Sequence, residues 1–338
     1  MRPFIALDET ILRQNAAAWR RYAGVPLRAV VKANAYGWGV ESVVRALADV
    51  VDAFCVADAD EFLVVRKFTS APIIIFSDVS LDRLDGIIAA GGIPTIDTLT
   101  SLEFCIDVSR RLATPLKIRL GIMQAFGWNG ITLGQLPAYA ARLYNNRLEV
   151  ELWTHLTDEN AWREQTGLLA RAGFVLREAG VKIAGSEVAS TVPLALHGAM
   201  GTSVRVGIGL FGATFGQDVP GIRCALCVKA PIIQCAPSRG DMRVGYGGGF
   251  APDWGYVILA RCGYSDGLPR ALAGSSDILS IGMQYVTLHS EREKAIGTDI
   301  KLLDQTTNLD ELAARARISP HEVATAFGNA RMRSSVEG

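Results

Sequence analysis

The sequence predicts an α/β protein with a (β/α)₈ TIM-type barrel over residues 8–221 and a smaller, mainly-β C-terminal domain over residues 222–338. Two observations predict the barrel. Short apolar runs alternate eight times with amphipathic helical stretches, and polar residues able to carry chemistry stand at the ends of several runs, where barrel active sites collect. A third observation, the loss of helical periodicity after about Gly221, predicts the second domain.

The strand-like runs are short, apolar and bounded by turn residues, as strands buried in a barrel should be. They cover residues 27–33, 53–57, 72–76, 92–96, 115–121, 150–156, 182–186 and 204–212. Amphipathic helices are predicted between them, among them 40–50, 98–112 and 159–179. In the second of these, Thr100 and Glu103 have the spacing of a capping box.

The C-terminal domain is predicted from β-type runs at 224–235, 242–245, 256–261, 278–282 and 285–289, which Gly, Pro, Asp and Ser turns separate. One helix, 309–316, interrupts these runs, with Asn308 and Glu311 as a capping pair, and a last helical stretch follows Ser319. Residues 1–7 could pair with this domain rather than join the barrel.

Composition excludes several function classes. The 338 residues carry 34 basic and 34 acidic side chains, so no electrostatic footprint points to nucleic acid or to an anionic membrane. No run is long enough to span a bilayer, and the N-terminus is too acidic for a signal peptide. Six scattered cysteines are interpreted as packing thiols, which favours a reducing, cytoplasmic setting.

The stretch AVVKANAYGWG, residues 29–39, places a lysine at the end of the first apolar run. We expect such a lysine to be partly desolvated, so that its amine can lose a proton near neutral pH and attach an aldehyde covalently. Gly37 and Gly39 allow a close approach of backbone to a ligand, and Tyr36 offers a hydroxyl. Taken alone, Lys32 would be interpreted as a solvated lysine at a strand end.

This stretch resembles the cofactor-attachment motif of the alanine racemase family. Members of this family are pyridoxal 5′-phosphate (PLP) enzymes of fold type III. The resemblance spans nearly the whole chain. It implies that Lys32 carries the cofactor and that Tyr36 lies in the cofactor site. Trp38 departs from the histidine that the family usually has at its position.

The run VRVGIGLFG, residues 204–212, contains the pattern G-x-G-x-x-G. A dinucleotide site would need a helix directly after the glycines, but residues 213–220 have no helical period. Loops after the seventh and eighth strands of barrels commonly bind phosphate, so we interpret these glycines as exposing backbone N–H groups to a phosphate.

The same run resembles the eighth-strand motif of the family. This implies that Arg205 faces the pyridine nitrogen of the cofactor, and that Gly207 and Ile208 hold the phosphate together with Ser190. Because an arginine does not give up its proton, it leaves the pyridine nitrogen unprotonated and the ring a weaker electron sink. Such a ring disfavours side reactions such as transamination.

Racemisation removes the Cα proton from one face and returns one on the other, so it needs two acid/base groups. Lys32 can serve one face. CGYSDGLPR, residues 262–270, resembles the tyrosine-base motif of the family, which implies that Tyr264 serves the other. His155 matches a histidine that links this tyrosine to the cofactor arginine, and Met283 matches a methionine whose backbone meets the substrate carboxylate. In the family the tyrosine and methionine come from the partner subunit, which implies a homodimer with shared active sites.

The resemblance weakens at substrate-facing positions. Gln284 replaces the usual aspartate, and His321 replaces a tyrosine that normally contacts the phosphate. The resemblance is therefore stronger for the cofactor cradle than for the substrate side, and alanine is the default substrate beside another small or polar amino acid.

The fifth strand differs most. Lys117 matches a family lysine that is often carbamylated, but the arginine that holds the substrate carboxylate is missing, its position falling on Gln124 or Ala125. Lys117 and Arg119 stand two residues apart on a strand and face the same way. We therefore expect both near the substrate, with Arg119 replacing part of the missing arginine.

Three functions compete. The first is a PLP-dependent amino acid racemase using Lys32 and Tyr264. The second is another PLP reaction of an amino acid on this scaffold, such as retro-aldol cleavage or decarboxylation. This second class includes the reaction of a divergent homologue from a biosynthetic pathway. The third is a PLP carrier without catalysis, which would not need the tyrosine motif. Tyr264→Phe separates the first two, because a one-faced reaction needs no second base.

Overall fold

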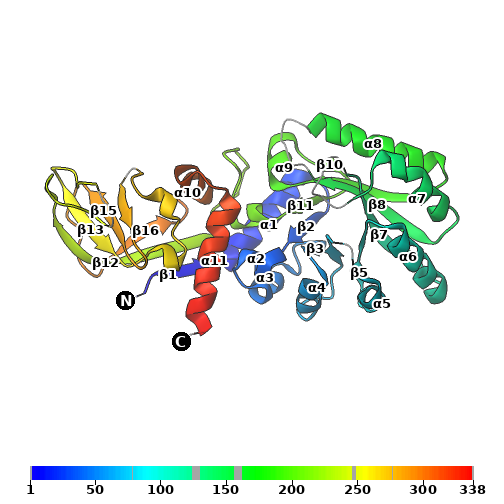
Figure 1. Cartoon of the computed structure of the whole chain (residues 1–338), viewed down its shortest axis with the longest axis horizontal. Coiled ribbons are helices and arrows are strands. Elements are labelled where there is room, and N and C mark those ends of the chain that lie inside the picture. Colours follow the sequence, from blue (N-terminus) through cyan, green and yellow to red (C-terminus); the bar gives the residue numbers. More distant parts are fainter. Residues whose placement is uncertain are drawn as a thin grey trace.

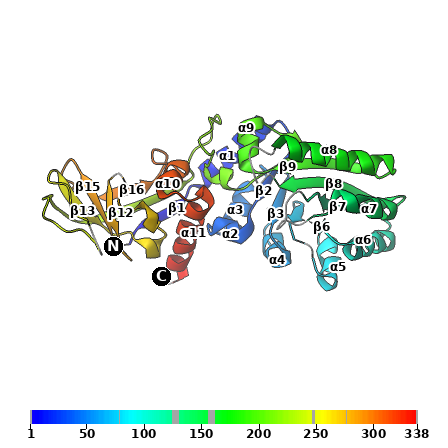
Figure 2. The ribbon, with the colours of Figure 1, turned by 45° about the horizontal axis from the view of Figure 1, so that its top comes forward.

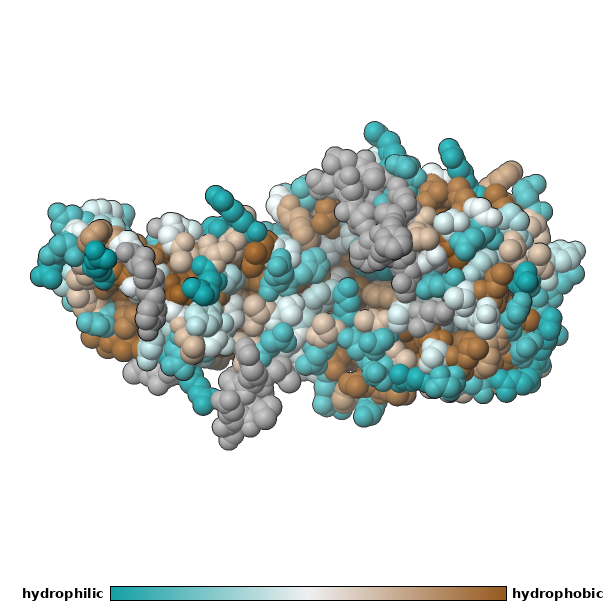
Figure 3. Space-filling model, viewed as in Figure 1, coloured by the Kyte–Doolittle hydropathy of each residue, from teal (hydrophilic) through white to brown (hydrophobic). Residues whose placement is uncertain are grey.

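The computed structural model describes residues 2–77, 79–123, 130–155, 162–245, 249–275 and 277–336. The molecule is elongated, with a (β/α)₈ barrel at one end and a mainly-β domain at the other (Figure 1), so the predicted fold class is confirmed. Hydrophilic and hydrophobic residues are interspersed over the visible face of both ends (Figure 3). Within the described residues, no helix combines the length and the apolar character needed to cross a membrane.

The barrel strands form two five-stranded sheets, ordered β11-β2-β3-β4-β5 and β6-β7-β8-β9-β10. Neighbours in these sheets run parallel, except that β10 is antiparallel to β9. β11 lies beside β9, which brings the two sheets together into a ring. The strands are β2 Leu27–Val30, β3 Ala53–Val56, β4 Ile73–Ile75, β5 Gly92–Ile93, β6 Thr95–Ile96, β7 Leu116–Gly121, β8 Leu148–His155, β9 Ile183–Ala189, β10 Met200–Gly201 and β11 Val204–Val206.

One predicted run, 92–96, is divided into β5 and β6 at Pro94. Proline has no backbone N–H to donate to a ladder, so regular pairing stops there. The Pro94 carbonyl still accepts a hydrogen bond from the Arg119 N–H at 2.9 Å. β5 and β6 therefore occupy a single strand position that joins the two sheets.

The barrel helices lie outside the strands and cover them (Figures 1 and 2). They are α1 Glu9–Ala23, α3 Val40–Leu47, α4 Ala59–Arg66, α5 Leu81–Ala89, α6 Leu99–Leu112, α7 Leu136–Leu143, α8 Trp162–Glu178 and α9 Thr191–His197. The short element α2, Lys32–Tyr36, is a left-handed turn directly after β2 and not one of these covering helices. The capping box predicted at Thr100 and Glu103 is wrong. Helix α6 begins two residues earlier, because the extended backbone of Thr98 lets its side chain accept a hydrogen bond from the Ser101 N–H.

The C-terminal domain contains a sheet ordered β1-β12-β13-β15-β14, with β16 also paired to β12. β1, Phe4–Leu7, runs antiparallel to β12, so the first residues of the chain join this sheet. The strand predicted at 242–245 is wrong, because only an isolated bridge between Arg243 and Phe250 forms there. The remaining strands are β12 Leu226–Pro237, β13 Tyr256–Ala260, β14 Ile278–Ile281, β15 Val286–Ser290 and β16 Asp299–Leu303, the last of which was not predicted.

Two helices end the chain, α10 Leu309–Ala316 and α11 Pro320–Val336. Asn308 caps α10 by accepting a hydrogen bond from the Glu311 N–H, as its position predicted. Helix α11 lies between the barrel and the β domain (Figure 1) and contacts the loop after β2. The buried Trp38 indole donates to the Ala324 carbonyl of α11 at 2.9 Å, which gives this departure from the family motif a packing role.

Candidate active site

Lys32 opens a turn of unusual backbone conformation directly after β2. The four residues from Ala33 to Tyr36 all have φ between 52° and 56°, the left-handed region, although none is glycine. This conformation costs about 1–2 kcal/mol per residue, so neighbouring contacts must hold it. The Glu61 carboxylate accepts from the Ala33 N–H at 2.6 Å, and the Asn34 side chain accepts from the Val40 N–H at 2.8 Å.

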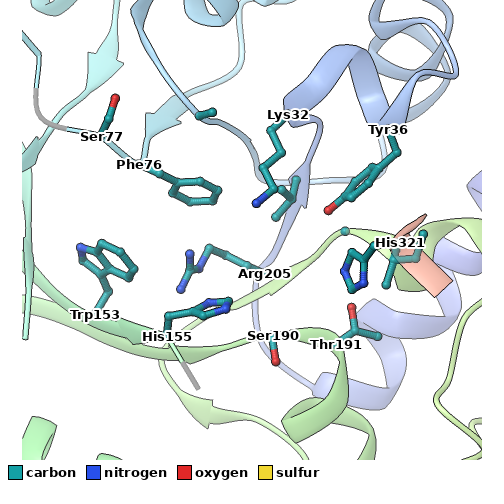
Figure 4. Close-up of a pocket in the computed structure, with 14 residues that line it drawn as sticks. Lys32, Tyr36, Phe76, Ser77, Trp153, His155, Ser190, Thr191, Arg205 and His321 are labelled. Carbon is teal, nitrogen blue, oxygen red and sulfur yellow. The ribbon is translucent and has the colours of Figure 1, made fainter. Parts of the chain in front are cut away.

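A cavity of about 400 Å³ opens at the carboxyl ends of the barrel strands. Its lining contains every residue that the sequence assigned to the cofactor, namely Lys32, Tyr36, His155, Ser190, Arg205, Gly207 and Ile208. The Lys32 amine and the Arg205 guanidinium both point into this space (Figure 4). Lys32 is exposed rather than partly desolvated as predicted, because the cavity of the single chain is open to solvent above it.

One end of the cavity gathers hydroxyl groups and exposed backbone. Ser190 and Thr191 begin helix α9, and Gly207 precedes the short helical turn Ile208–Phe211. Burial raises the pKa of the Tyr36 hydroxyl, so Tyr36 remains a donor at neutral pH. Burial and the nearby charge of Lys32 lower the pKa of His321, which the sequence placed at this end.

We expect Gly207→Ala to weaken PLP binding by about tenfold or more, because a β-carbon at this position would clash with the Tyr36 hydroxyl and lie 3.3 Å from the Val30 side chain. Equilibrium titration of the apoprotein with PLP would measure the effect. Gly167→Ala is the matched control, since a β-carbon there meets nothing within 4 Å. Equal affinity in both variants would contradict this account of the cavity wall.

The opposite end of the cavity is built around Arg205. Its Nε donates to the Glu187 carboxylate, and its Nη2 donates to the Thr154 carbonyl at 3.3 Å. The guanidinium carbon lies 5.0 Å from the ring centre of Phe76 and 4.9 Å from that of Trp153. Sequence reasoning missed both aromatic residues, and it also missed the lining residues Val30, Ala57, Ser77 and Thr191. A threonine next to the predicted serine was the one signal that could have identified Thr191.

Arg119 does not occupy the expected place near the substrate. It is completely buried, with its guanidinium bound to two carboxylates, those of Glu151 at 3.0 Å and Glu187 at 2.9 Å. Lys117 lines a different cavity, of about 380 Å³, at the amino ends of the strands. Both side chains face the barrel interior, but they stand too early on β7 to reach the carboxyl end. Gln124 and Ala125 lie outside the described residues.

Tyr264 and Met283 lie together on the C-terminal domain. The Met283 carbonyl accepts hydrogen bonds from the Ser265 N–H at 2.9 Å and from the Ser265 hydroxyl at 2.7 Å. The Asp266 carboxylate accepts from the Gly263 N–H and from Arg261, which fixes the turn of Tyr264. Tyr264 is 39% and Met283 58% exposed, and neither lines the Lys32 cavity of its own chain.

Comparison with known proteins now identifies the family. The model of the alanine racemase N-terminal domain matches residues 7–215, well over half of the chain. The chain belongs to the alanine racemase family. Its members are PLP-dependent racemases, and this chain is accordingly a PLP-dependent isomerase of the amino acid racemase class.

Individual relatives match over nearly their whole length. The alanine racemase of Sodalis glossinidius is 28% identical and aligns with 96% of this chain and 97% of its own. Among solved structures, the alanine racemase of a D-cycloserine-producing Streptomyces lavendulae superposes with a TM-score of 0.83 at 20% identity, covering 97% of this chain and 95% of that one. The Bartonella henselae alanine racemase, solved with covalently bound pyridoxal phosphate, has a TM-score of 0.83 at 17% identity and covers 98% of both chains.

The cavity residues fit the cofactor chemically. A lysine amine can hold its aldehyde, an arginine can donate to its ring nitrogen, and the end with hydroxyls and glycine backbone suits its phosphate. Gly207 has no β-carbon to fill the space beside the Tyr36 hydroxyl. The backbone of Gly207 therefore stays accessible to a ligand.

Proposed function

We propose that this chain racemises a small amino acid, alanine by default, with Lys32 and a tyrosine of a second copy, Tyr264, as the two bases. The observation that carries the proposal is the convergence of Lys32 and Arg205 on one cavity (Figure 4), whose lining also contains Ser190, Thr191 and Gly207. A lysine, a non-titrating arginine and a phosphate-type cradle are what a PLP racemase requires.

Bound PLP supplies an electron-withdrawing ring that makes the Cα proton of an attached amino acid acidic. The chain supplies the rest. We assign the holding of the cofactor and the transfer of a proton on one face to the Nζ of Lys32. Arg205 donates to the ring nitrogen and stays charged, because a guanidinium does not lose its proton. Tyr36, Ser190, Gly207 and Ile208 bind the phosphate in this assignment, and His155 lies beside Arg205 to orient the second base.

Among the described residues, the tyrosine that we assign to the second face does not line the cavity of its own chain. Tyr264 and Met283 are exposed neighbours on the β domain. We propose that they complete the cavity of a partner in a head-to-tail homodimer, and that the partner also covers the exposed Lys32. The exposed aromatic residues Phe250, Trp254 and Tyr285 of the same domain are compatible with burial against a second copy.

Alanine remains the default substrate in our proposal. Phe76 and Trp153 flank Arg205, so they would border the ring of the cofactor rather than the substrate. Arg119 is engaged by carboxylates, so we no longer assign it to the substrate. The backbone N–H of the partner's Met283 is the carboxylate donor that remains in our proposal.

The proposal is tested by incubating PLP-loaded protein with a panel of L-amino acids in deuterated water. We expect deuterium at Cα together with the D-enantiomer, fastest with alanine, as measured by mass spectrometry and chiral chromatography. Deuterium without inversion would contradict the second base. Release of carbon dioxide or of an aldehyde would instead favour decarboxylation or retro-aldol cleavage on the same scaffold.

A further inference from the structure

Five charged side chains lie inside the barrel between the Lys32 cavity and the cavity at the opposite end. This interior charge cluster comprises Arg28, Arg119, Glu151, Glu187 and Arg205, each from a different strand. Arg205 lines the first cavity, and Arg28 and Glu151 line the second. Three arginines and two glutamates leave one net positive charge. Buried charges persist only when they are paired, so each carboxylate must serve more than one arginine.

Glu187 is the centre of the cluster. It is completely buried, and its two carboxylate oxygens have different partners. Oε1 accepts from Arg205, while Oε2 accepts from Arg28 at 2.7 Å and from Arg119 at 2.9 Å. Glu151 also bridges Arg28 and Arg119, which together lower its pKa to about 2 against the cost of burial, but it does not contact Arg205.

The bond to Glu187 determines which edge of Arg205 is available to a ligand. Nε is bound to Glu187 and Nη2 to the Thr154 carbonyl. Among the described residues, Nη1 of Arg205 has no protein acceptor. The flanking rings of Phe76 and Trp153 attract the guanidinium but do not fix its rotation. The remaining edge is therefore oriented by the carboxylate.

Strand register makes the same carboxylate necessary. Arg205 on β11 lies directly opposite Arg28 on β2. Like charges at opposite positions of neighbouring strands repel each other. Glu187, on the other side of β11, accepts from both arginines and so holds Arg205 in place. Without it, the guanidinium would be repelled by Arg28 and would turn towards solvent in the cavity.

We propose that Glu187 is a positioning residue, which fixes Arg205 against the ring nitrogen of the cofactor. The inference rests on the role proposed for Arg205 above. It assigns a task to a buried acid that the PLP-attachment and tyrosine motifs do not include.

The test is Glu187→Gln, studied as the PLP-loaded enzyme. The substitution keeps the shape of the side chain but adds one net positive charge beside Arg205. The added positive charge beside Arg205 makes protonation of the bound cofactor harder, so the pH midpoint of its visible absorbance should fall by about one unit. Because Arg205 is also misplaced, we expect kcat to fall about tenfold or more with KM changed less than about threefold.

Glu151→Gln is the matched control, since it removes the same charge from the same cluster but leaves the contact between Glu187 and Arg205 intact. Its midpoint should move less than half as far, with kcat within about threefold of wild type. The double variant Glu187→Gln/Arg119→Gln restores the net charge of the cluster. Its midpoint should return towards the wild-type value while kcat stays low, and its balanced charge keeps the test available if Glu187→Gln does not fold.

Equal midpoints and equal kcat in Glu187→Gln and Glu151→Gln would overturn the inference and reduce the cluster to a structural ion network. A double variant with wild-type kcat would also overturn it, because charge alone would then explain the effect. If wild-type protein takes up no PLP at Lys32, the proposed function itself fails together with the inference. These results are distinguishable, since the first two require a wild-type enzyme that binds PLP and is active.

Discussion

Replacing Lys32 with alanine is expected to reduce racemisation by at least about a thousandfold, because our proposal gives this one side chain both the cofactor attachment and a proton transfer. Its amine points into the cavity towards Arg205, and its backbone is held by the left-handed turn from Ala33 to Tyr36 (Figure 4). Borohydride reduction followed by peptide mass spectrometry should place a pyridoxyl group on Lys32 of the wild type and on no lysine of the variant. Chiral chromatography gives the rate.

The matched control is Lys182→Ala, which removes an exposed lysine whose only described ion pair is a 3.5 Å contact with Glu149. We expect wild-type labelling and rate from it. A small primary amine added to the Lys32→Ala enzyme should restore part of the activity, since it replaces the lost amine. Labelling of another lysine, or substantial activity without rescue, would show that the attachment site lies elsewhere.

The positions of site residues could be predicted from the sequence where a reactive or polar residue stands at the end of a predicted strand. Lys32 after β2, His155 at the end of β8 and Gly207 after β11 could be placed together because all carboxyl ends of a parallel barrel meet at one rim. Residues from seven separate positions were found on one cavity for this reason. Trp153 and Phe76 were missed because an aromatic residue within an apolar run is usually core.

The ion pairs between side chains inside the barrel could not be predicted by considering each strand separately. The argument that Lys117 and Arg119 share a face was right in orientation, but it did not include the neighbouring strand. Arg119 lies directly opposite Glu151 in the parallel ladder of β7 and β8, so a carboxylate takes its guanidinium. The sequence does show that charged residues interrupt several of the predicted barrel strands. Which of them pair depends on the register between neighbouring strands, which is known only from the fold.

The turn after Lys32 shows a second kind of limit. In a sequence, glycine is the usual sign of a residue with positive φ. Ala33, Asn34, Ala35 and Tyr36 all have positive φ although they carry β-carbons. The backbone of this turn donates to Glu61 of helix α4, and helix α11 from the end of the chain packs against the turn. Local propensity favours neither contact. Tertiary contacts therefore help to determine the backbone geometry directly after Lys32, to which our proposal assigns the chemistry.

Mixing two inactive variants, Lys32→Ala and Tyr264→Phe, is expected to restore activity. If each active site takes Lys32 from one chain and Tyr264 from the other, a heterodimer of the variants contains one intact site and one doubly defective site. Random exchange makes half of the dimers mixed, so the mixture should reach about a quarter of wild-type activity. Subunits would be exchanged by mild denaturation and refolding, and the rate measured by chiral chromatography.

A tyrosine acting within its own chain predicts the opposite result, because every chain in the mixture would then lack one of the two bases. The control is a refolded mixture of wild type with the double variant Lys32→Ala/Tyr264→Phe, in which each site of a mixed dimer lacks a base and activity should not exceed that of the wild-type dimers. The exposed position of Tyr264, outside the cavity of its own chain, is the reason that we expect complementation. Tyr264→Phe alone should still bind PLP at Lys32, so its inactivity would mark a missing proton donor and not a lost cofactor. Failure of the mixture to recover, with dimers formed and cofactor bound, would require the second base to be sought elsewhere around the cavity.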